Sequence, residues 1–102
     1  MTLALPKSTT QLLTELTGDP RPETALLIIL KDVIAHRLER VEAGLREYEA
    51  KYGMPFDEYK HLWKSEDRPE HYSYETETDY LEWEDLVTRK KRIDKAARLL
   101  QS

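Results

Sequence analysis

The feature that most constrains this fold is a stretch of thirty-one residues, 22–52, in which nothing strongly disfavours a helix. Pro22 suits the first helical turn, and Gly53 suits the position just after the last turn. Gly44 lies inside the stretch but costs only about 1 kcal/mol relative to alanine. A helix of this length spans about 46 Å, more than a small domain usually needs. We therefore expect it to pack along much of its length against other helices.

Apolar residues repeat along this stretch at the spacing of a coiled-coil seam. One row repeats every seven residues: Leu27, Ile34, Val41 and Tyr48. A second row lies four residues after the last three of these: Leu38, Leu45 and Tyr52. Lys31 interrupts the pattern. We expect the seam to join two copies of the chain, and the predicted dimerisation residues are Leu27, Ile34, Leu38, Val41 and Leu45.

The N-terminal half of the stretch carries more apolar surface than one seam requires. Residues 26–30 read Leu-Leu-Ile-Ile-Leu, and because successive helical residues advance by about 100°, these side chains encircle the helix axis. Contacts on more than one side are needed to cover them. A short first helix and a second copy of the chain could supply these contacts, and a tightly packed monomeric bundle is the alternative.

Shorter helices are predicted on both sides of the long one. The first covers residues 9–17, where Ser8 and Gln11 have the spacing of a capping box, and residues 18–21 connect it to the long helix. The second covers residues 55–65, where aromatic side chains recur at intervals of three and four: Phe56, Tyr59 and Trp63.

The remainder of the chain predicts a loop and a last helix. Residues 66–78 contain Pro69 and show no sustained apolar period, which indicates an acidic loop. Asp79 and Glu82 have capping-box spacing, so the last helix is predicted over 79–101. Its apolar stripe begins at Trp83, which favours a core position for that ring. The predicted fold is one all-α domain over residues 1–102, with the long and last helices as an antiparallel hairpin in a dimeric bundle.

Composition excludes several functional classes. The chain has 102 residues, of which 39% are hydrophobic and 35% are charged, so a compact monomer would be only marginally stable. It has no cysteine, which excludes disulfides, thiol catalysis and cysteine-ligated metals. The longest apolar run, residues 25–30, is too short to cross a bilayer, and no secretory signal is apparent. We expect a cytoplasmic protein without a membrane segment.

The segment HYSYETETDYLEWEDL, residues 71–86, interleaves six carboxylates with four aromatic rings. It belongs to an acidic block, residues 65–85, with a net charge of −8. Tyrosine and tryptophan often anchor interfaces, and neighbouring carboxylates can steer a basic partner toward them. The segment therefore predicts a surface for a locally basic protein, with these contact residues: Tyr72, Tyr74, Glu75, Glu77 and Asp79.

The residues do not predict an enzyme or a metal site. Glu58 and His61 have the Glu-x-x-His step of di-iron bundles, but no second such step is present. Asp32 and His36 could reach one ion and lack an obvious third ligand. No glycine-rich phosphate loop or nucleophile motif is present, because the three glycines are scattered. We expect no catalytic residue, no bound metal and no cofactor.

Nucleic-acid binding is the alternative suggested by the C-terminal region. Residues 86–102 have a net charge of +5, and adjacent cations could neutralise phosphates. The residues that would contact nucleic acid are Arg89, Lys91, Arg92 and Lys95. On a helix these cations point in several directions, which is also typical of an ordinary solvated face, and the acidic block would repel DNA.

Two segments resemble small helical prokaryotic proteins of an antitoxin-like family. They are LREYEAKYGMPFDEY, residues 45–59, and DYLEWEDL, residues 79–86, and with the long helix the resemblance covers roughly residues 30 to 100. The first thirty residues have no counterpart in it. The resemblance implies a protein that covers the basic substrate groove of a toxin, commonly a ribonuclease. The expected function is therefore an antitoxin-like interaction module, and a structural or adaptor subunit without a toxin is the other alternative.

Overall fold

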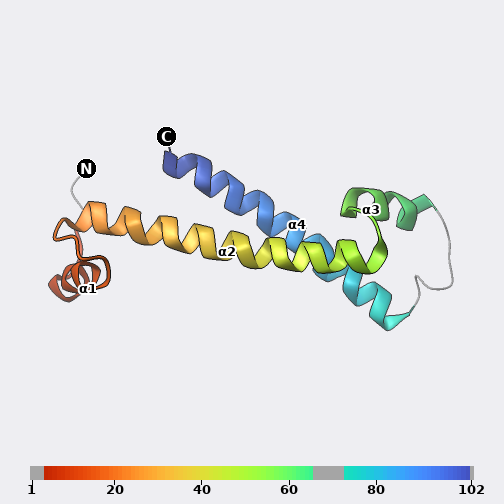
Figure 1. The fold of residues 1–102 in the computed structure, drawn as a ribbon, viewed down its shortest axis with the longest axis horizontal. Coiled ribbons are helices and arrows are strands. Elements are labelled where there is room, and N and C mark those ends of the chain that lie inside the picture. Colours follow the sequence, from red (N-terminus) through yellow and green to blue (C-terminus); the bar gives the residue numbers. More distant parts are fainter. Residues whose placement is uncertain (1–3, 66–72, 102) are drawn as a thin grey trace.

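The computed structural model describes residues 4–65 and 73–101. This part of the chain contains four helices, α1 (Lys7–Thr17), α2 (Pro22–Tyr52), α3 (Phe56–Ser65) and α4 (Tyr74–Gln101), and no strand. The prediction of an all-α fold is confirmed. The molecule is elongated, with extents of 59 × 25 × 21 Å. Helix α2 forms its long axis, α1 lies across one end of α2, and α3 lies near the other end (Figure 1).

Local sequence sets the ends of α2 where they were predicted. Pro22 occupies the first turn, where its missing N–H is not needed. Gly53 follows the last turn with a φ of 71°, and its N–H donates to the Glu49 carbonyl at 2.8 Å. That left-handed backbone conformation is available to glycine without the steric penalty of a Cβ. The two residues thus define a helix of 31 residues.

The start of α1 differs slightly from its prediction. The helix begins at Lys7 instead of residue 9, and no side chain caps its first turn. Instead, the backbone N–H groups of Thr9 and Thr10 donate to the Pro6 carbonyl at 3.0 and 3.1 Å. The capping box predicted at Ser8 is therefore wrong. The other short helix, α3, begins at Phe56, one residue after the predicted position.

The start of α4 is the larger correction. The helix begins at Tyr74, five residues before the predicted Asp79, so the end of the predicted loop is helical. Ser73 supplies the cap, because its Oγ accepts the N–H of Thr76 at 3.1 Å. Residues 66–72, the rest of the predicted loop, lie outside the described residues. Asp79 consequently belongs to the second turn of α4, where its side chain can face another helix.

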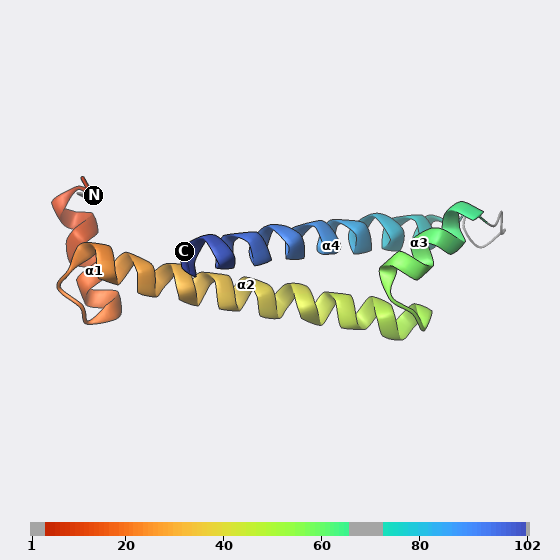
Figure 2. The same ribbon diagram turned by 90° about the horizontal axis from the view of Figure 1, so that it is seen from above.

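Helix α4 runs back along α2 in the opposite direction (Figure 2). Lys51 contacts Asp79, and Gly44 contacts Leu86. Residues later in α4 therefore pack against residues earlier in α2, as in an antiparallel helix pair. A Cβ built on Gly44 would lie 2.9 Å from Cδ1 of Leu86. The glycine therefore permits a close approach of the two helices, which offsets its low helix propensity.

The main core is a cluster of aromatic rings between α2, α3 and α4. Trp83 is fully buried, and Phe56 and Tyr59 are almost fully buried. The Trp83 ring lies 5.2 Å from the rings of both Phe56 and Tyr59, measured between centroids. Tyr48 and Tyr52 of α2 stack on Trp83 at 5.7 and 5.6 Å. The core position predicted for Trp83 is confirmed. Through this ring, α4 packs against both α2 and α3.

A second, smaller packing site joins α1 to the start of α2. Leu13 of α1 is 7% exposed and Ala25 of α2 is fully buried. Gly18, with a φ of 76°, ends α1 and allows the chain to turn toward α2. Among the described residues of this end of the molecule, these are the only two buried hydrophobic side chains. The cover that α1 gives to α2 is therefore small.

Candidate functional site

The predicted partner-contact residues occupy the first turns of α4 and differ in their surroundings. Tyr74 is 84% exposed, and Glu77 is also exposed. Glu75 is exposed too, but its Oε1 lies 2.7 Å from the Lys51 Nζ of α2. The Asp79 side chain is only 13% exposed. Tyr72 lies outside the described residues.

Asp79 forms contacts within the chain. Its Oδ2 accepts hydrogen bonds from Nζ of Lys51 and from the hydroxyl of Tyr52, both at 2.5 Å. These bonds fix the start of α4 against the end of α2. Asp79 therefore has a stabilising role, and its carboxylate is not free for a partner.

Opposing effects set the pKa of Asp79. Burial raises the pKa of the carboxyl, but the hydrogen bonds from Lys51 and Tyr52 outweigh burial and hold the pKa below its ordinary value of 3.8. A lowered pKa in the folded state means that the charged form contributes stability above pH 3.8. That contribution is lost as the pH falls below this value, through the folded pKa.

We expect Asp79→Asn to be less stable than the wild type at pH 7 and the difference to shrink below about pH 4. The reason is that protonation of Asp79 in the wild type removes the interaction that asparagine lacks at every pH. Urea unfolding at pH 7 and pH 3, followed by circular dichroism, measures the difference. Glu77→Gln, at an exposed carboxylate, is the control and should show little difference at either pH. A pH-independent loss in Asp79→Asn would contradict the assignment.

Three other carboxylates of α4 also contact neighbouring side chains. Glu82 accepts a short hydrogen bond from the Tyr48 hydroxyl, and burial together with this carboxylate raises the pKa of Tyr48 to about 12. Oε2 of Glu84 lies 3.8 Å from Nζ of Lys60, and Oδ2 of Asp85 lies 2.8 Å from Nη2 of Arg89. Four carboxylates of α4 are therefore paired with cations within the molecule: Glu75, Asp79, Glu84 and Asp85.

The outward face of α4 carries exposed side chains, and of these Asp85 is already paired with Arg89. Residues separated by three or four positions share a helix face, and four such residues lie opposite the core-facing Trp83: Tyr74, Glu77, Leu81 and Asp85. We call these four residues the acidic face. Leu81 is 65% exposed. Sequence reasoning missed Leu81, although its spacing of seven from Tyr74 is visible once the helix is known to begin at Tyr74.

The predicted dimerisation residues do not form one continuous exposed seam. Val41 is 6% exposed, and Leu45 packs on the aromatic core, so α4 and the core already cover these two residues within the chain. Ile34 lines a groove between α2 and α4, and Leu38 is half-buried. Leu27 is 47% exposed. Only the N-terminal part of the seam is open to a second copy.

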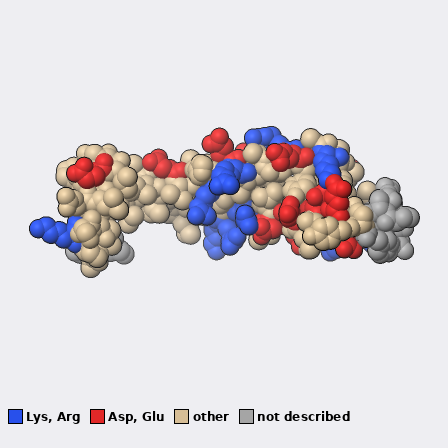
Figure 3. Space-filling view, turned by 90° about the horizontal axis from the view of Figure 1, so that it is seen from below, with Lys and Arg blue, Asp and Glu red and all other residues tan. Residues whose placement is uncertain are grey.

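Exposed aliphatic side chains are concentrated at the α1 end of the molecule. Six of them lie on α1 and on the first half of α2 and are between 37% and 67% exposed: Leu12, Leu16, Leu27, Ile28, Leu30 and Val33. We call these six residues the apolar end. In Figure 3 this end shows few charged side chains, whereas Lys and Arg gather near the middle of the rod and Asp and Glu toward the α3 end. The apolar sequence of residues 26–30 was the pattern that indicated this exposed aliphatic surface.

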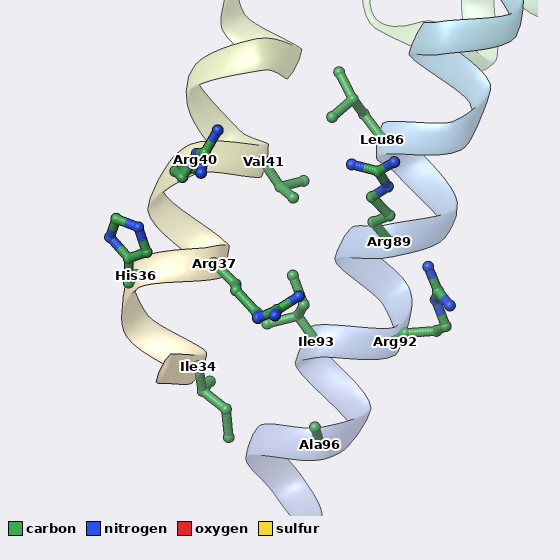
Figure 4. Close-up of a pocket in the computed structure, with 10 residues that line it drawn as sticks. All are labelled: Ile34, His36, Arg37, Arg40, Val41, Leu86, Arg89, Arg92, Ile93 and Ala96. Carbon is green, nitrogen blue, oxygen red and sulfur yellow. The ribbon is translucent and has the colours of Figure 1, made fainter. Parts of the chain in front are cut away.

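A basic groove of about 640 Å³ lies between α2 and α4. Its cationic lining consists of Arg37, Arg40, Arg89 and Arg92, with His36 at its edge (Figure 4). Its apolar lining consists of Ile34, Val41, Leu86, Ile93 and Ala96. Two of the four cations predicted for nucleic acid, Arg89 and Arg92, are thus brought together with arginines of α2. Lys91 and Lys95 are exposed and do not line the groove.

The candidate metal ligands are not assembled into a site. Glu58 and His61 are exposed on α3, and Asp32 and His36 are exposed on α2. The described ranges contain no group of three or more histidine, aspartate or glutamate side chains placed to hold a metal ion.

Comparisons with protein families, with curated proteins and with solved structures found no match. None of the described helices combines the length and the apolar character needed to cross a membrane. Three surfaces along the molecule are candidates for function: the apolar end, the basic groove and the acidic face.

Proposed function

We propose that this protein is an antitoxin-like interaction module that binds and neutralises a basic partner, such as a toxin nuclease, through the acidic face. The observation that supports the proposal is the exposure of Tyr74 and Leu81, at 84% and 65%, on one helix face that also carries carboxylates. A large ring and an aliphatic side chain exposed together offer contact area that the fold itself does not use.

Charge would direct the partner to this face. Glu77 and Asp85 flank Leu81, and α4 carries further carboxylates close by in the sequence, Glu75, Glu82 and Glu84. Such a cluster attracts a basic surface over distances up to about 10 Å at 0.1 M salt and accepts hydrogen bonds from arginine and lysine. An acidic surface of this kind can compete with the phosphate backbone of RNA for a nuclease groove.

The fold supports such a contact because the face is preorganised. Lys51 binds both Glu75 and Asp79, and Trp83 packs on the opposite side of α4, so the helix is held at both its start and its middle. A rigid helix loses little conformational entropy when a partner binds. Binding energy is then available for the contacts of Tyr74 and Leu81.

We further propose that the protein is a homodimer joined through the apolar end. A neutral, aliphatic surface has no charge with which to select a basic or acidic partner, and a twofold axis would pair it with the same surface of a second copy. Burying the six side chains against a second copy removes apolar surface from water, which contributes about 25 cal/mol per Å². The proposed interface then includes Leu27 of the predicted seam. Val41 and Leu45 of that seam do not belong to it, and Leu12 and Leu16 of α1 do.

Binding to the product of the neighbouring gene tests the proposed function. We expect a complex that weakens as the salt concentration rises, and we expect Tyr74→Ala with Leu81→Ala to weaken it by about 30-fold or more. Calorimetry measures the affinity, and rescue of growth during co-expression measures neutralisation. Leu99→Ala is the matched control, because Leu99 lies on the same helix and is 66% exposed. Failure of the neighbouring product to bind, or equal losses in both variants, would contradict the proposal.

A further inference from the structure

The basic groove lies outside both surfaces used by the proposed function, and we propose that it binds an acidic amphipathic helix of a partner protein. The inference goes beyond the proposed function, because that function uses the acidic face and concerns a basic partner. It rests on the charge of the groove, on its apolar lining and on the divergence of the two helices that form it.

Most of the positive charge in the groove is uncompensated. Arg37 and Arg89 extend from facing helices into the space between them (Figure 4). Arg89 pairs with Asp85 along its own helix. Arg37, Arg40 and Arg92 form no ion pair with any other residue of the part that the structure describes. No carboxylate lines the groove. Carboxylates from a ligand would relieve this concentration of positive charge and could form bidentate bonds with the guanidinium groups.

The groove also has an apolar lining. Five aliphatic side chains lie beside the arginines on the two helices: Ile34, Leu86, Ile93 and Ala96, which are at least partly exposed, and Val41, which is already buried. A ligand that matches both kinds of side chain must carry apolar groups on one side and carboxylates beside them. An amphipathic helix with leucines flanked by glutamates has this distribution, and a helix lying in an apolar groove is a recurring mode of recognition.

The shape of the groove suits a third helix. Helices α2 and α4 approach closely where Gly44 meets Leu86, and they diverge toward the C-terminus of α4 (Figure 1). The groove lies along this diverging part, with a volume of about 640 Å³. A third helix lying over it would complete a three-helix arrangement and would cover side chains that are now open to water.

The lining also favours a peptide over nucleic acid. No phenylalanine, tyrosine or tryptophan ring lines the groove, and His36 lies only at its edge, so unpaired bases would lack most of the stacking contacts that single-strand binding usually uses. Phosphate groups would gain nothing from the aliphatic side chains, which a leucine-bearing helix would cover. The positive charge of the groove would suit either an acidic peptide or nucleic acid. The apolar lining favours the peptide.

Two designed peptides of about 18 residues, roughly five helical turns, test the proposal on the full chain. Both carry leucines on one helical face; glutamates flank them in the first peptide and lysines in the second. We expect fluorescence anisotropy to show saturable binding of the acidic peptide and binding of the lysine peptide at least about tenfold weaker. Arg37→Ala with Arg89→Ala should reduce the affinity for the acidic peptide by about tenfold or more.

The control removes the same charge outside the groove. Lys91→Ala with Lys95→Ala also removes two cations from the exposed surface, and it should change the affinity less than about twofold. Circular dichroism melting curves confirm that each variant is folded. Equal losses in the two double variants, or no saturable binding of the acidic peptide, would overturn the proposal. So would DNA binding that depends on Arg37 and Arg89 while the peptide does not bind, or self-association lost in that variant, which would make the occupant a second copy.

Discussion

Trp83→Ala is expected to reduce the free energy of unfolding by about 3–5 kcal/mol, a large part of the roughly 5–15 kcal/mol that stabilises a natural domain. The indole is fully buried and contacts rings from α2 and α3. Alanine would leave a cavity that these rings cannot fill, because each is held by its own helix. We expect the variant to unfold at a much lower urea concentration and with a less cooperative transition.

Circular dichroism at a fixed protein concentration measures the unfolding. Tyr74→Ala is the control, because it removes an exposed ring from the same helix and should change stability by less than about 0.5 kcal/mol. Trp83→Phe should lose clearly less than Trp83→Ala. Phenylalanine keeps much of the ring, and it removes an indole N–H that has no hydrogen-bond partner among the described residues. An alanine variant as stable as the wild type would contradict a core centred on Trp83.

Leu16→Glu combined with Leu27→Glu is expected to convert the proposed dimer into a monomer, with a dissociation constant at least about 100-fold higher. Both leucines belong to the apolar end and are 67% and 47% exposed. A dimer would bury the introduced carboxylates in an aliphatic interface, and burying an unpaired charge is strongly unfavourable. The single chain leaves both positions accessible to water, so the monomer itself should remain folded.

Sedimentation equilibrium over a range of protein concentrations measures the change in mass. Leu99→Glu introduces the same charge at a leucine of similar exposure, 66%, outside the apolar end. We expect this control to remain dimeric. A wild-type chain that is monomeric at every concentration would contradict the proposed dimer. A dimer unaffected by the double substitution would place its interface elsewhere on the molecule.

The proposed dimer and the proposed partner contact use opposite ends of the rod. The apolar end lies on α1 and the start of α2, and the acidic face lies on the first half of α4, near α3 (Figures 1 and 3). Because α2 separates the two surfaces, loss of one should leave the other intact. The dimer variant should therefore still bind the product of the neighbouring gene.

Local chemistry determined the parts of the fold that were predicted correctly. Pro22 and Gly53 define α2 through a fixed φ and a left-handed φ, and neither effect depends on distant residues. The period of apolar residues placed Trp83 on the inner side of the last helix. The start of α4 was missed because Ser73 caps a first turn that has no apolar period, so its polar residues read as a loop.

The candidate surfaces were predicted less completely, because they depend on which helices meet. The sequence indicated an apolar seam on α2, but only the tertiary structure shows that α4 covers Val41 within the same chain. Asp79 looked like an exposed member of an acidic segment, yet its position in the second turn of α4 turns it toward Lys51.

The sequence by itself determined the all-α character of this protein and both ends of α2, because proline and glycine conformation and apolar periodicity act within a few residues. Only the tertiary structure decided its surfaces. Arg37 and Arg89 are about fifty positions apart, and they line one groove because α4 packs antiparallel on α2 in the register set by Gly44 and Leu86. That register follows from side-chain packing between distant segments, which no local pattern encodes.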